Sequence, residues 1–367
     1  MSKLSVHLVT WNGAKYIPYL FDSFKKQTFQ DWQMVVLDNA SEDATVGAIE
    51  NELISFSYPH ELIRNKENKG FAGGHNQLFR LAMNKEQDAP EYIVLLNQDM
   101  YLMPDCLEKL VVFLDREHDV AAVTPRLMKW NFCLLKEKPG ISLEESFTDC
   151  IDSLGLKVFR SRRVIEKYAG KRWQDLKPKM NLSFHAERFR ESGTALEVFG
   201  VSGAFPLFRR SSLSYVAFSD GTFFDNDYHA YKEDVDLAFR LRSAGYRSFV
   251  LLDTLAYHDR SASGQEDLGD IAASKNKKRQ SSWVTYHSYK NHLMTLYKNE
   301  YWHNWVLDAV FIKWYELKKF GWFLLFKPSV LKGLGDMMKM RKSLKQKRME
   351  ITKKRNVSWK VIRTWWR

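Results

Sequence analysis

The sequence predicts an α/β fold in which helices cover a parallel, Rossmann-like sheet. Short apolar segments with the composition of buried strands alternate with amphipathic helical segments over the first hundred residues. This alternation is typical of β-α-β units with right-handed crossovers. The apolar segments also end in polar side chains, and open α/β sheets bind their ligands at the carboxyl ends of the strands.

The expected elements follow this alternation in order. A first helix carries Tyr16, Leu20 and Phe24 on one stripe, and Ser41 is the expected N-cap of a second helix. The glycine-rich loop at 68–76 opens a third helix. Strands are expected at 4–9, 33–37, 61–63, 92–96 and 249–252, and helices at 231–245 and 339–355. A strand-like apolar pattern at 198–207 is broken by Gly200 and Gly203.

Charge divides the 367-residue chain into two unlike parts. Residues 271–367 carry 23 Lys and Arg against 5 Asp and Glu, whereas the rest of the chain carries 33 against 39. The basic part also contains eight of the 12 tryptophans. At roughly 100–200 residues per domain, we expect one domain over 1–265 with an insertion at 130–197, and a basic helical extension over 266–367.

Cysteine spacing and hydropathy indicate the cellular compartment in which the protein works. The three cysteines form no C-x-x-C pair, which is typical of a reducing compartment and disfavours a structural zinc site. The apolar run at residues 4–9 is too short for a secretory signal. No run reaches the ~18 apolar residues of a membrane span. We therefore expect a cytoplasmic protein.

Several polar residues after predicted strands or at helix starts suggest one site. Asp99 follows the strand at 92–96, where a hard divalent cation bridging to a phosphate would satisfy its carboxylate. Each residue has a structural alternative, since Asp38 can cap a helix and His258 can be a core histidine. Acids at 233–236 suit the positive end of a helix dipole. Their shared position at one sheet edge favours the functional interpretation.

Five collinear segments resemble the inverting family 2 glycosyltransferases, which use a nucleotide-sugar donor in a GT-A fold. Val6–Asn12 is similar to the opening strand and loop of that family, and Ser23–Thr28 to its S-x-x-x-Q-T helix end. Val35–Thr45 resembles its V-V-D-N-x-S-x-D-x-T signature. Leu95–Asp99 stands at the D-x-D metal motif, with an Asn for its first acid. Lys232–Arg240 resembles the E-D-x-D-L-x-x-R segment that holds the base.

A narrower resemblance is to bacterial rhamnosyltransferases of the same family. It implies transfer of L-rhamnose from dTDP-rhamnose in cell-surface polysaccharide synthesis, with a UDP-hexose or UDP-galactofuranose as alternative donors. The segments that carry it are Asn68–Asn76, Ile151–Gly155, Arg162–Arg163, Phe199–Ala204, Arg209–Arg210, Tyr257–Ser261 and Lys290–Met294.

The family resemblance implies a role for each candidate residue. Asp234 would be the general base, and Asp99 with His258 would hold Mg²⁺ or Mn²⁺, to which an uncharged Asn97 adds no charge. Glu233 and Asp236 are expected to be structural, one of them pairing with Arg240. The donor would contact Thr10, Trp11, Asn12, Asp38, Asn68, Gly70, Gly73, Asn76 and Asn97.

The resemblance and the charge pattern also predict the class of acceptor and the role of the basic extension. The acceptor would be a glycan or a lipid-linked glycan, with the insertion at 130–197 shaping its side of the site. The tail at 281–367 would dock on the anionic inner face of the cell membrane as a peripheral segment. The alternative interpretation of this tail is a solvated basic helix that packs only on the rest of the chain.

Two other function classes remain open at this stage. A nucleic-acid-binding protein is suggested by the basic, aromatic tail, but the acidic body disfavours it and no nucleic-acid partner is expected. A salt-sensitive gel shift would support that class. A non-catalytic sugar-nucleotide binder would bind the donor tightly without turnover.

Overall fold

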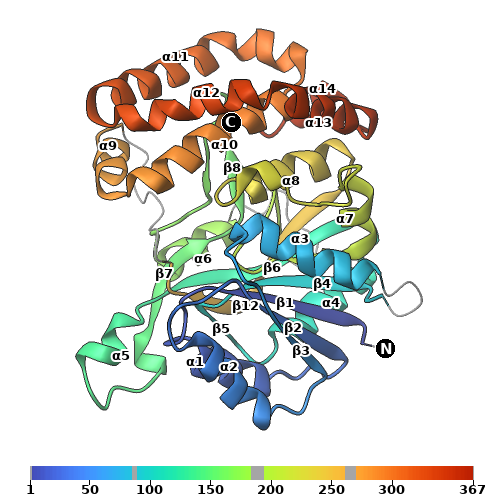
Figure 1. Cartoon of the computed structure of the whole chain (residues 1–367), viewed down its shortest axis with the longest axis vertical. Helices are drawn as coiled ribbons and strands as arrows, with labels where there is room; N and C mark the ends of the chain where they lie inside the picture. Colours follow the sequence, from blue (N-terminus) through green and yellow to red (C-terminus); the bar gives the residue numbers. More distant parts are fainter. Residues whose placement is uncertain (1, 85–88, 183–193, 261–269, 367) are drawn as a thin grey trace.

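The computed structural model describes residues 2–84, 89–182, 194–260 and 270–366. A ten-stranded mixed sheet lies at the centre, and a layer of C-terminal helices lies at one end of the molecule (Figure 1). The predicted α/β fold is confirmed. Its path order is β10-β12-β6-β11-β4-β1-β2-β3, with β5 and β7 attached to β12 and β6.

The first half of the sheet is parallel, as the alternation of elements predicts. Strand β1 pairs with both β2 and β4, and β3 continues the sheet beyond β2. The Ser41 prediction is wrong, because α2 begins at Thr45 and Ser41 instead donates a hydrogen bond to Asp38 (2.6 Å). The elements are β1 (Leu4–Thr10), α1 (Ile17–Lys25), β2 (Trp32–Asp38), α2 (Thr45–Ile54), β3 (His60–Arg64), α3 (Gly70–Met83) and β4 (Tyr92–Asn97).

The second half of the sheet is mixed, and β11 runs antiparallel to both β4 and β6. The strand-like pattern expected at 198–207, broken by Gly200 and Gly203, corresponds to the end of β10 and the start of β11, and residues 199–206 leave the sheet between them. Gly200 lets this segment approach α8 closely, because a Cβ there would collide with Ala238. The elements are β5 (Met100–Leu102), α4 (Cys106–Arg116), β6 (Val120–Trp130), β10 (Ala195–Val198), β11 (Leu207–Arg209), α7 (Arg210–Val216), α8 (Glu233–Ser243) and β12 (Arg247–His258).

Strand β4 shows why this sheet is buried on both faces. Val94 and Leu96 belong to a core cluster with α1 and α4, whereas Ile93 and Leu95 belong to a cluster with α3, α7 and α8. Alternate side chains of a strand point to opposite faces. A continuous apolar strand is therefore needed here, and the polar residues that follow it lie at its exposed carboxyl end.

The insertion adds short elements at one edge of the sheet. Strand β7 pairs with β6, and β8 and β9 form a separate hairpin. The elements are α5 (Cys133–Glu137), β7 (Phe147–Ser153), β8 (Leu156–Val158), β9 (Val164–Glu166) and α6 (Trp173–Leu182).

The C-terminal helices pack on the rest of the chain through a buried polar interface. Lys298 of α10 is fully buried and forms ion pairs with Asp225 and Asp236, the latter at 2.9 Å. Arg162 of the insertion, also buried, pairs with Glu300 (2.7 Å) and Asp308 (3.0 Å). The helices are α9 (Asp270–Arg279), α10 (Ser282–Asn299), α11 (Trp302–Phe326), α12 (Lys332–Lys339), α13 (Arg341–Lys353) and α14 (Trp359–Arg363).

This interface predicts a large stability effect for Lys298→Met. Removing the ammonium leaves the Asp225 and Asp236 carboxylates buried with fewer partners, and breaking a buried ion pair costs roughly 3–5 kcal/mol. We expect urea unfolding followed by circular dichroism to show a loss of this size. The exposed Lys342→Met is the control, with a change within about 0.5 kcal/mol. Equal losses in the two variants would contradict the prediction.

Among the described helices, none has both the length and the apolar character needed to cross a bilayer.

Candidate active site

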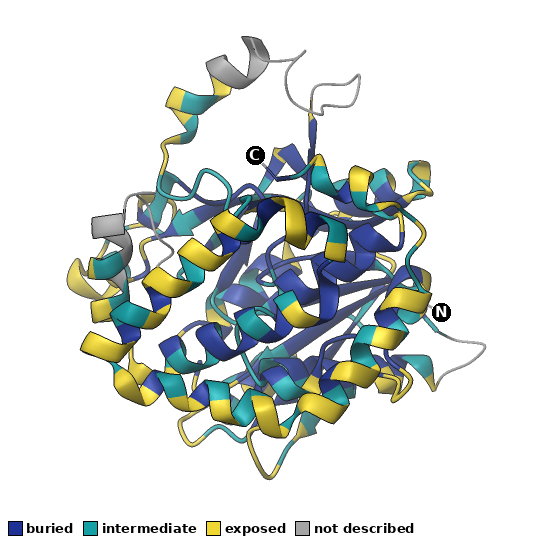
Figure 2. Ribbon diagram, turned by 90° about the horizontal axis from the view of Figure 1, so that it is seen from above, coloured by how far each residue is buried: buried dark blue, intermediate teal, exposed yellow. Residues whose placement is uncertain are grey.

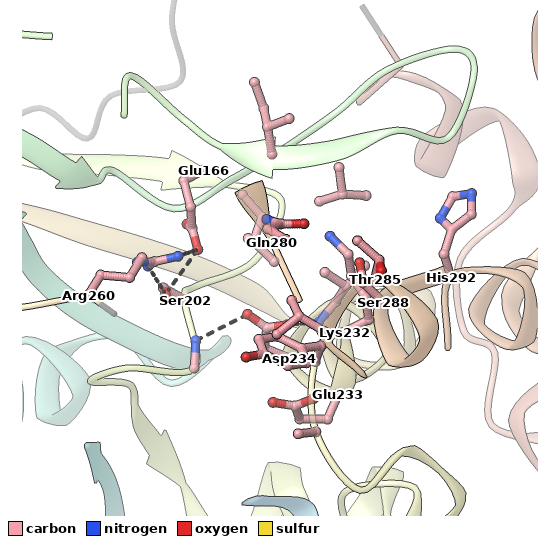
Figure 3. Close-up of a pocket in the computed structure, with 18 of the residues that line it drawn as sticks. Glu166, Ser202, Lys232, Glu233, Asp234, Arg260, Gln280, Thr285, Ser288 and His292 are labelled. Atoms are coloured by element: carbon pink, nitrogen blue, oxygen red, sulfur yellow. Dashed lines mark hydrogen bonds and ion pairs between the residues drawn. The ribbon is translucent and has the colours of Figure 1, made fainter. Parts of the chain in front are cut away.

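A cavity of about 500 Å³ lies where the carboxyl edge of the sheet meets the β8–β9 hairpin and helices α8, α10 and α11. Four predicted site residues line it together: Asn97, Asp99, Asp234 and His258. They come from three segments far apart in the sequence. Figure 3 shows part of its lining, with Asp234 between Arg260 on one side and His292 on the other.

His258 is held between two carboxylates. Its Nδ1 lies 2.9 Å from Asp152 Oδ2, and its Nε2 lies 3.3 Å from Asp99 Oδ1. Burial lowers the pKa of His258, but the two carboxylates raise it by more, to about 9. A carboxylate that fixes one ring nitrogen and so orients the other is typical of metal-binding histidines. Nε2 and the Asp99 carboxylate are therefore the groups that could hold a divalent cation here.

Further ligands would have to come from outside this pair. No group of three or more His, Cys, Asp or Glu with metal-binding geometry occurs among the described residues. Mg²⁺ characteristically uses one or two carboxylates together with water and substrate phosphates. The arrangement therefore suits a cation that is shared with a diphosphate.

An ion-pair network that the sequence analysis did not assign supports this region. Arg260 lies 3.0 Å from Asp152 and 3.2 Å from Glu166, and Ser202 donates to Glu166 (3.1 Å). Burial raises the pKa of Glu166, Arg260 lowers it, and Asp234 and Asp152 raise it again. Asp152 and Arg260 both lie in the segments that carry the rhamnosyltransferase resemblance, which is the sequence signal that could have identified them.

Asp234 lies in the first turn of α8 with its carboxylate fixed by the backbone. Its Oδ2 accepts a hydrogen bond from the Gly203 N–H (3.2 Å) and its Oδ1 from the Val235 N–H (2.7 Å). A Cβ on residue 203 would lie 3.3 Å from the Asp234 Cβ, so glycine leaves room for this approach. A fixed, solvent-accessible carboxylate can accept a proton from a hydroxyl in the cavity.

The neighbouring acids differ from Asp234. Asp236 is fully buried and pairs with Arg240 (2.9 Å), which agrees with the structural role expected for it. Glu233 does not pair with Arg240, and its buried Oε2 has no hydrogen-bond partner. Burial and the adjacent Asp234 raise the pKa of Glu233. Glu233 therefore favours its protonated form.

The loop that precedes α8 is held by helix α10. His229, Tyr231 and Lys232 have positive φ values of 60°, 69° and 72°, a conformation that costs energy for residues other than glycine. Asn291 Nδ2 donates to three carbonyl oxygens of this loop, those of Tyr228 (3.0 Å), Ala230 (2.8 Å) and Tyr231 (2.7 Å). The C-terminal helices thus fix the backbone immediately before Asp234.

The predicted nucleotide loop forms a connected hydrogen-bond network. Asp38 is buried and accepts from Thr10 Oγ1 (3.2 Å), and the Asn12 N–H donates to Ser41 Oγ (2.9 Å). The exposed Trp11 exchanges two backbone hydrogen bonds of 2.9 Å with the Gln98 side chain. Gln98, which the sequence analysis did not single out, links this loop to the segment that carries Asp99.

Gly70 and Asn76, two of the residues predicted to bind the donor, contact another part of the protein. Gly70 has a φ of +73°, and the space where its Cβ would stand is filled by His229 rather than left open. Asn76 is fully buried, and its amide bonds to the backbone of Phe224 (2.9 and 3.0 Å) and to Asn226 (2.7 Å). These two residues pack α3 against residues 224–229 and do not line the cavity.

The other two residues of that segment also lie outside the cavity lining. The Asn68 side chain accepts from Asn39 Nδ2 (2.9 Å) and from the Gly70 N–H (2.8 Å). Gly73 is half-buried on α3. Phe71 is the residue of this segment that lines the cavity.

Comparison with known proteins shows what the N-terminal part of the chain is similar to. Residues 5–141 match the model of "Glycosyl transferase family 2". The O-antigen chain rhamnosyltransferase RfbN of Salmonella typhimurium is 30% identical over 124 residues, which are 34% of this chain and 37% of that protein. The first curated relatives are matched over 20–41% of their own length.

Solved structures share the fold at low identity. S. aureus TarS 1–349 in complex with UDP-GlcNAc has a TM-score of 0.52 at 17% identity, covering 96% of this chain and 89% of that one. GalNAc-T7 with UDP, GalNAc and Mn²⁺ has a TM-score of 0.55 at 12% identity, covering 81% and 48%. Both support the GT-A-like arrangement.

Proposed function

Since residues 5–141 match the model of glycosyl transferase family 2, we propose that the protein is an inverting glycosyltransferase of bacterial polysaccharide synthesis. It would move a sugar from a nucleotide donor to a hydroxyl of a glycan or lipid-linked glycan. The observation that carries this proposal is the convergence of Asp99, His258 and Asp234 on one cavity. The similarity to two proteins named as glycosyltransferases, TarS and RfbN, supports it.

Asp234 acts as the general base in the proposed reaction. Its carboxylate takes the proton from the acceptor hydroxyl as that oxygen bonds to the anomeric carbon. The bond from the anomeric carbon to the diphosphate breaks at the opposite face, which inverts the configuration. The Gly203 and Val235 N–H groups hold the carboxylate in place during this step.

Asp99 and His258 would hold a divalent cation, Mg²⁺ or Mn²⁺, beside the donor. When bound, the cation neutralises charge on the leaving diphosphate. Asp152 keeps the Nε2 atom of His258 directed at Asp99. The Mn²⁺ named with GalNAc-T7 supports this part of the proposal.

L-Rhamnose from dTDP-rhamnose is the proposed donor sugar, and RfbN supports it. The test is release of nucleoside diphosphate by the full chain with Mn²⁺ and a panel of dTDP-rhamnose, UDP-hexoses and UDP-galactofuranose. Preferential turnover of dTDP-rhamnose is expected. Turnover of a UDP-sugar would keep the transferase and change the donor, whereas tight donor binding without release would indicate a non-catalytic binder.

Helix α11 supports membrane docking as a second part of the proposal. Figure 2 views the molecule from the end where the C-terminal helices lie, and exposed residues recur along them. Lys313 and Lys318 stand beside Trp305 and Trp314 on this helix, which suits an anionic lipid surface. Its exposed apolar residues are Trp302, Trp305, Val306, Leu307, Val310, Phe311, Trp314, Leu317, Phe320, Leu324, Leu325 and Phe326.

The structure restricts which part of the basic extension can contact a membrane. Trp366 is buried against Phe199 and Phe239, and Trp322 packs beside Phe323. Helix α10 supplies the buried Lys298, so a truncation within it would remove the partner of Asp225 and Asp236 beside the cavity. The exposed face of α11 is therefore the surface to test.

We expect the triple variant Val310→Ser, Trp314→Ser, Leu317→Ser to lose membrane binding. Each exposed side chain that enters the interface contributes about 1 kcal/mol or more, so the three together give a roughly hundredfold loss. Co-flotation with phosphatidylglycerol liposomes, at low and high salt, measures it. The matched control replaces Ile54, Leu81 and Val112, which are exposed elsewhere. Equal flotation of both triple variants would contradict docking through α11.

A further inference from the structure

The short loop before helix α8 has a strained backbone. His229 has φ 60° and ψ −61°, and the Ala230 N–H donates to the Tyr228 carbonyl oxygen (2.6 Å). This geometry is a γ-turn of the rarer hand, which is strained for residues other than glycine. Tyr231 and Lys232 follow with φ values of 69° and 72°. A backbone of this kind persists only where the surrounding structure holds it in place.

One side chain of α10 holds this loop on both sides of the γ-turn. Asn291 is fully buried, and its Nδ2 donates to the carbonyl oxygens of Tyr228, Ala230 and Tyr231. An amide nitrogen carries two hydrogens, which are shared here among three acceptors. These bonds fix the carbonyl groups relative to one another, up to the residue that precedes Lys232.

The loop continues directly into the first turn of α8. Lys232 and Asp234 both line the cavity, and the Lys232 carbonyl oxygen accepts from the Asp236 N–H (3.0 Å) (Figure 3 labels Lys232 and Asp234). The Gly203 N–H reaches the Asp234 carboxylate at 3.2 Å, the long end of the range for such a bond. A small rotation of this first turn would therefore separate the carboxylate from Gly203.

A second polar contact of α10 shows what is particular to Asn291. Thr295, one turn further along the same helix, shares a hydrogen bond with the Tyr228 hydroxyl (2.7 Å). That bond joins two side chains. Asn291 instead bonds the backbone of Ala230 and Tyr231, two residues that line the cavity. Helix packing accounts for the contact of Thr295, whereas Asn291 acts on the geometry of the cavity wall.

We propose that Asn291 is a positioning residue, which holds the strained loop and thereby places the Asp234 carboxylate in the cavity. Asn291 does not line the cavity, so it acts through the backbone of the loop. Its importance for a general base rests on the proposed function, whereas its effect on the loop does not. A displacement of about 1 Å at a reacting group can cost roughly a hundredfold in rate.

The test is Asn291→Ala in the full chain, which removes all three hydrogen bonds while the high helix propensity of alanine favours α10. With dTDP-rhamnose and Mn²⁺, we expect turnover to fall by about a hundredfold. Donor affinity should stay within a fewfold, since Asp99 and His258 are unchanged. Hydrogen exchange should become faster at the Ala230 and Asp236 amides, the donors of the γ-turn and of the first turn of α8.

Thr295→Val is the matched control, because it removes a buried hydrogen bond of α10 without removing a donor to the loop carbonyls. Its turnover should stay within a fewfold of the wild type, and its loop amides should exchange as in the wild type. Equal losses of turnover in the two folded variants would overturn the inference. Wild-type exchange of the loop amides in Asn291→Ala would also overturn it, as would equal losses of turnover and donor affinity.

Asn291→Gln decides the question if the alanine variant does not fold. Its amide keeps both hydrogens but lies one methylene further from α10, so the loop should shift and turnover should fall by less than in a folded alanine variant. Turnover and loop exchange equal to those of the wild type would overturn the inference. Absence of transfer by the wild type, with faster loop exchange in either variant, would overturn the transferase proposal and keep Asn291 as the residue that holds the loop.

Discussion

Asp234→Asn is expected to lower turnover by about 10²–10⁴-fold, the contribution of a positioned general base, while donor affinity stays nearly unchanged. The amide keeps the shape of the carboxylate but cannot take a proton. It also retains one acceptor oxygen for the Gly203 or Val235 N–H, so the start of α8 should persist. Steady-state turnover and donor titration on the same preparation measure the two effects separately.

Glu233→Gln is the control for this assignment. The two acids are adjacent, and the raised pKa of Glu233 favours its neutral form, which glutamine imitates. We expect its turnover to stay within a fewfold of the wild type. If Glu233→Gln loses as much activity as Asp234→Asn, the base is Glu233 or the pair acting together. If Asp234→Asn loses donor affinity and turnover equally, the residue positions the substrate instead.

Asp99→Ala should abolish the response to Mn²⁺ and reduce transfer by about a hundredfold or more, since a catalytic cation stabilises the transition state by several kcal/mol. Without the cation, a carboxylate facing a diphosphate is repulsive. His258→Ala removes the other proposed ligand and should weaken the response. Calorimetric titration of the donor with and without Mn²⁺ measures metal-dependent binding independently of turnover.

Asp259→Asn is the control variant for these two, because Asp259 directly follows His258 in the sequence. Its side chain accepts a hydrogen bond from Tyr16 (2.6 Å) instead of facing His258 Nε2. The Mn²⁺ enhancement should therefore survive in Asp259→Asn. Full activity of the wild type in excess EDTA, or an unchanged Mn²⁺ response in Asp99→Ala, would refute a metal at this pair.

The parallel half of the sheet and the cavity residues at its edge could be predicted because local patterns determine them. An apolar run such as Tyr92–Leu96 has few alternatives to a strand buried on both faces. Asp99 and His258 meet because β5, which begins at Met100, pairs antiparallel with the end of β12. By contrast, the packing of Gly70 and Asn76 on residues 224–229 depends on contacts about 150 residues apart, which no local pattern indicates.

The role of α10 could not be predicted for a different physical reason. Its buried side includes the polar residues Asn291, Thr295 and Lys298, which contact residues 225–236. The helix therefore has no clear apolar stripe from which its orientation could be predicted. Hydropathy assigns such residues to solvent. Their burial becomes understandable only with the partners in view, such as Asp236 for Lys298 and the loop carbonyls for Asn291.

The ion pairs that join Arg162, Asp308 and Arg363 have a consequence for biosynthesis. The sheet and the proposed catalytic residues leave the ribosome well before Asp308 and Arg363 are made. Until then, Arg162 lacks the carboxylates of Glu300 and Asp308, and Asp236 lacks the ammonium of Lys298. A nascent chain can therefore form its sheet early, but its cavity stays incomplete until α10 and α11, which line part of it, have been translated.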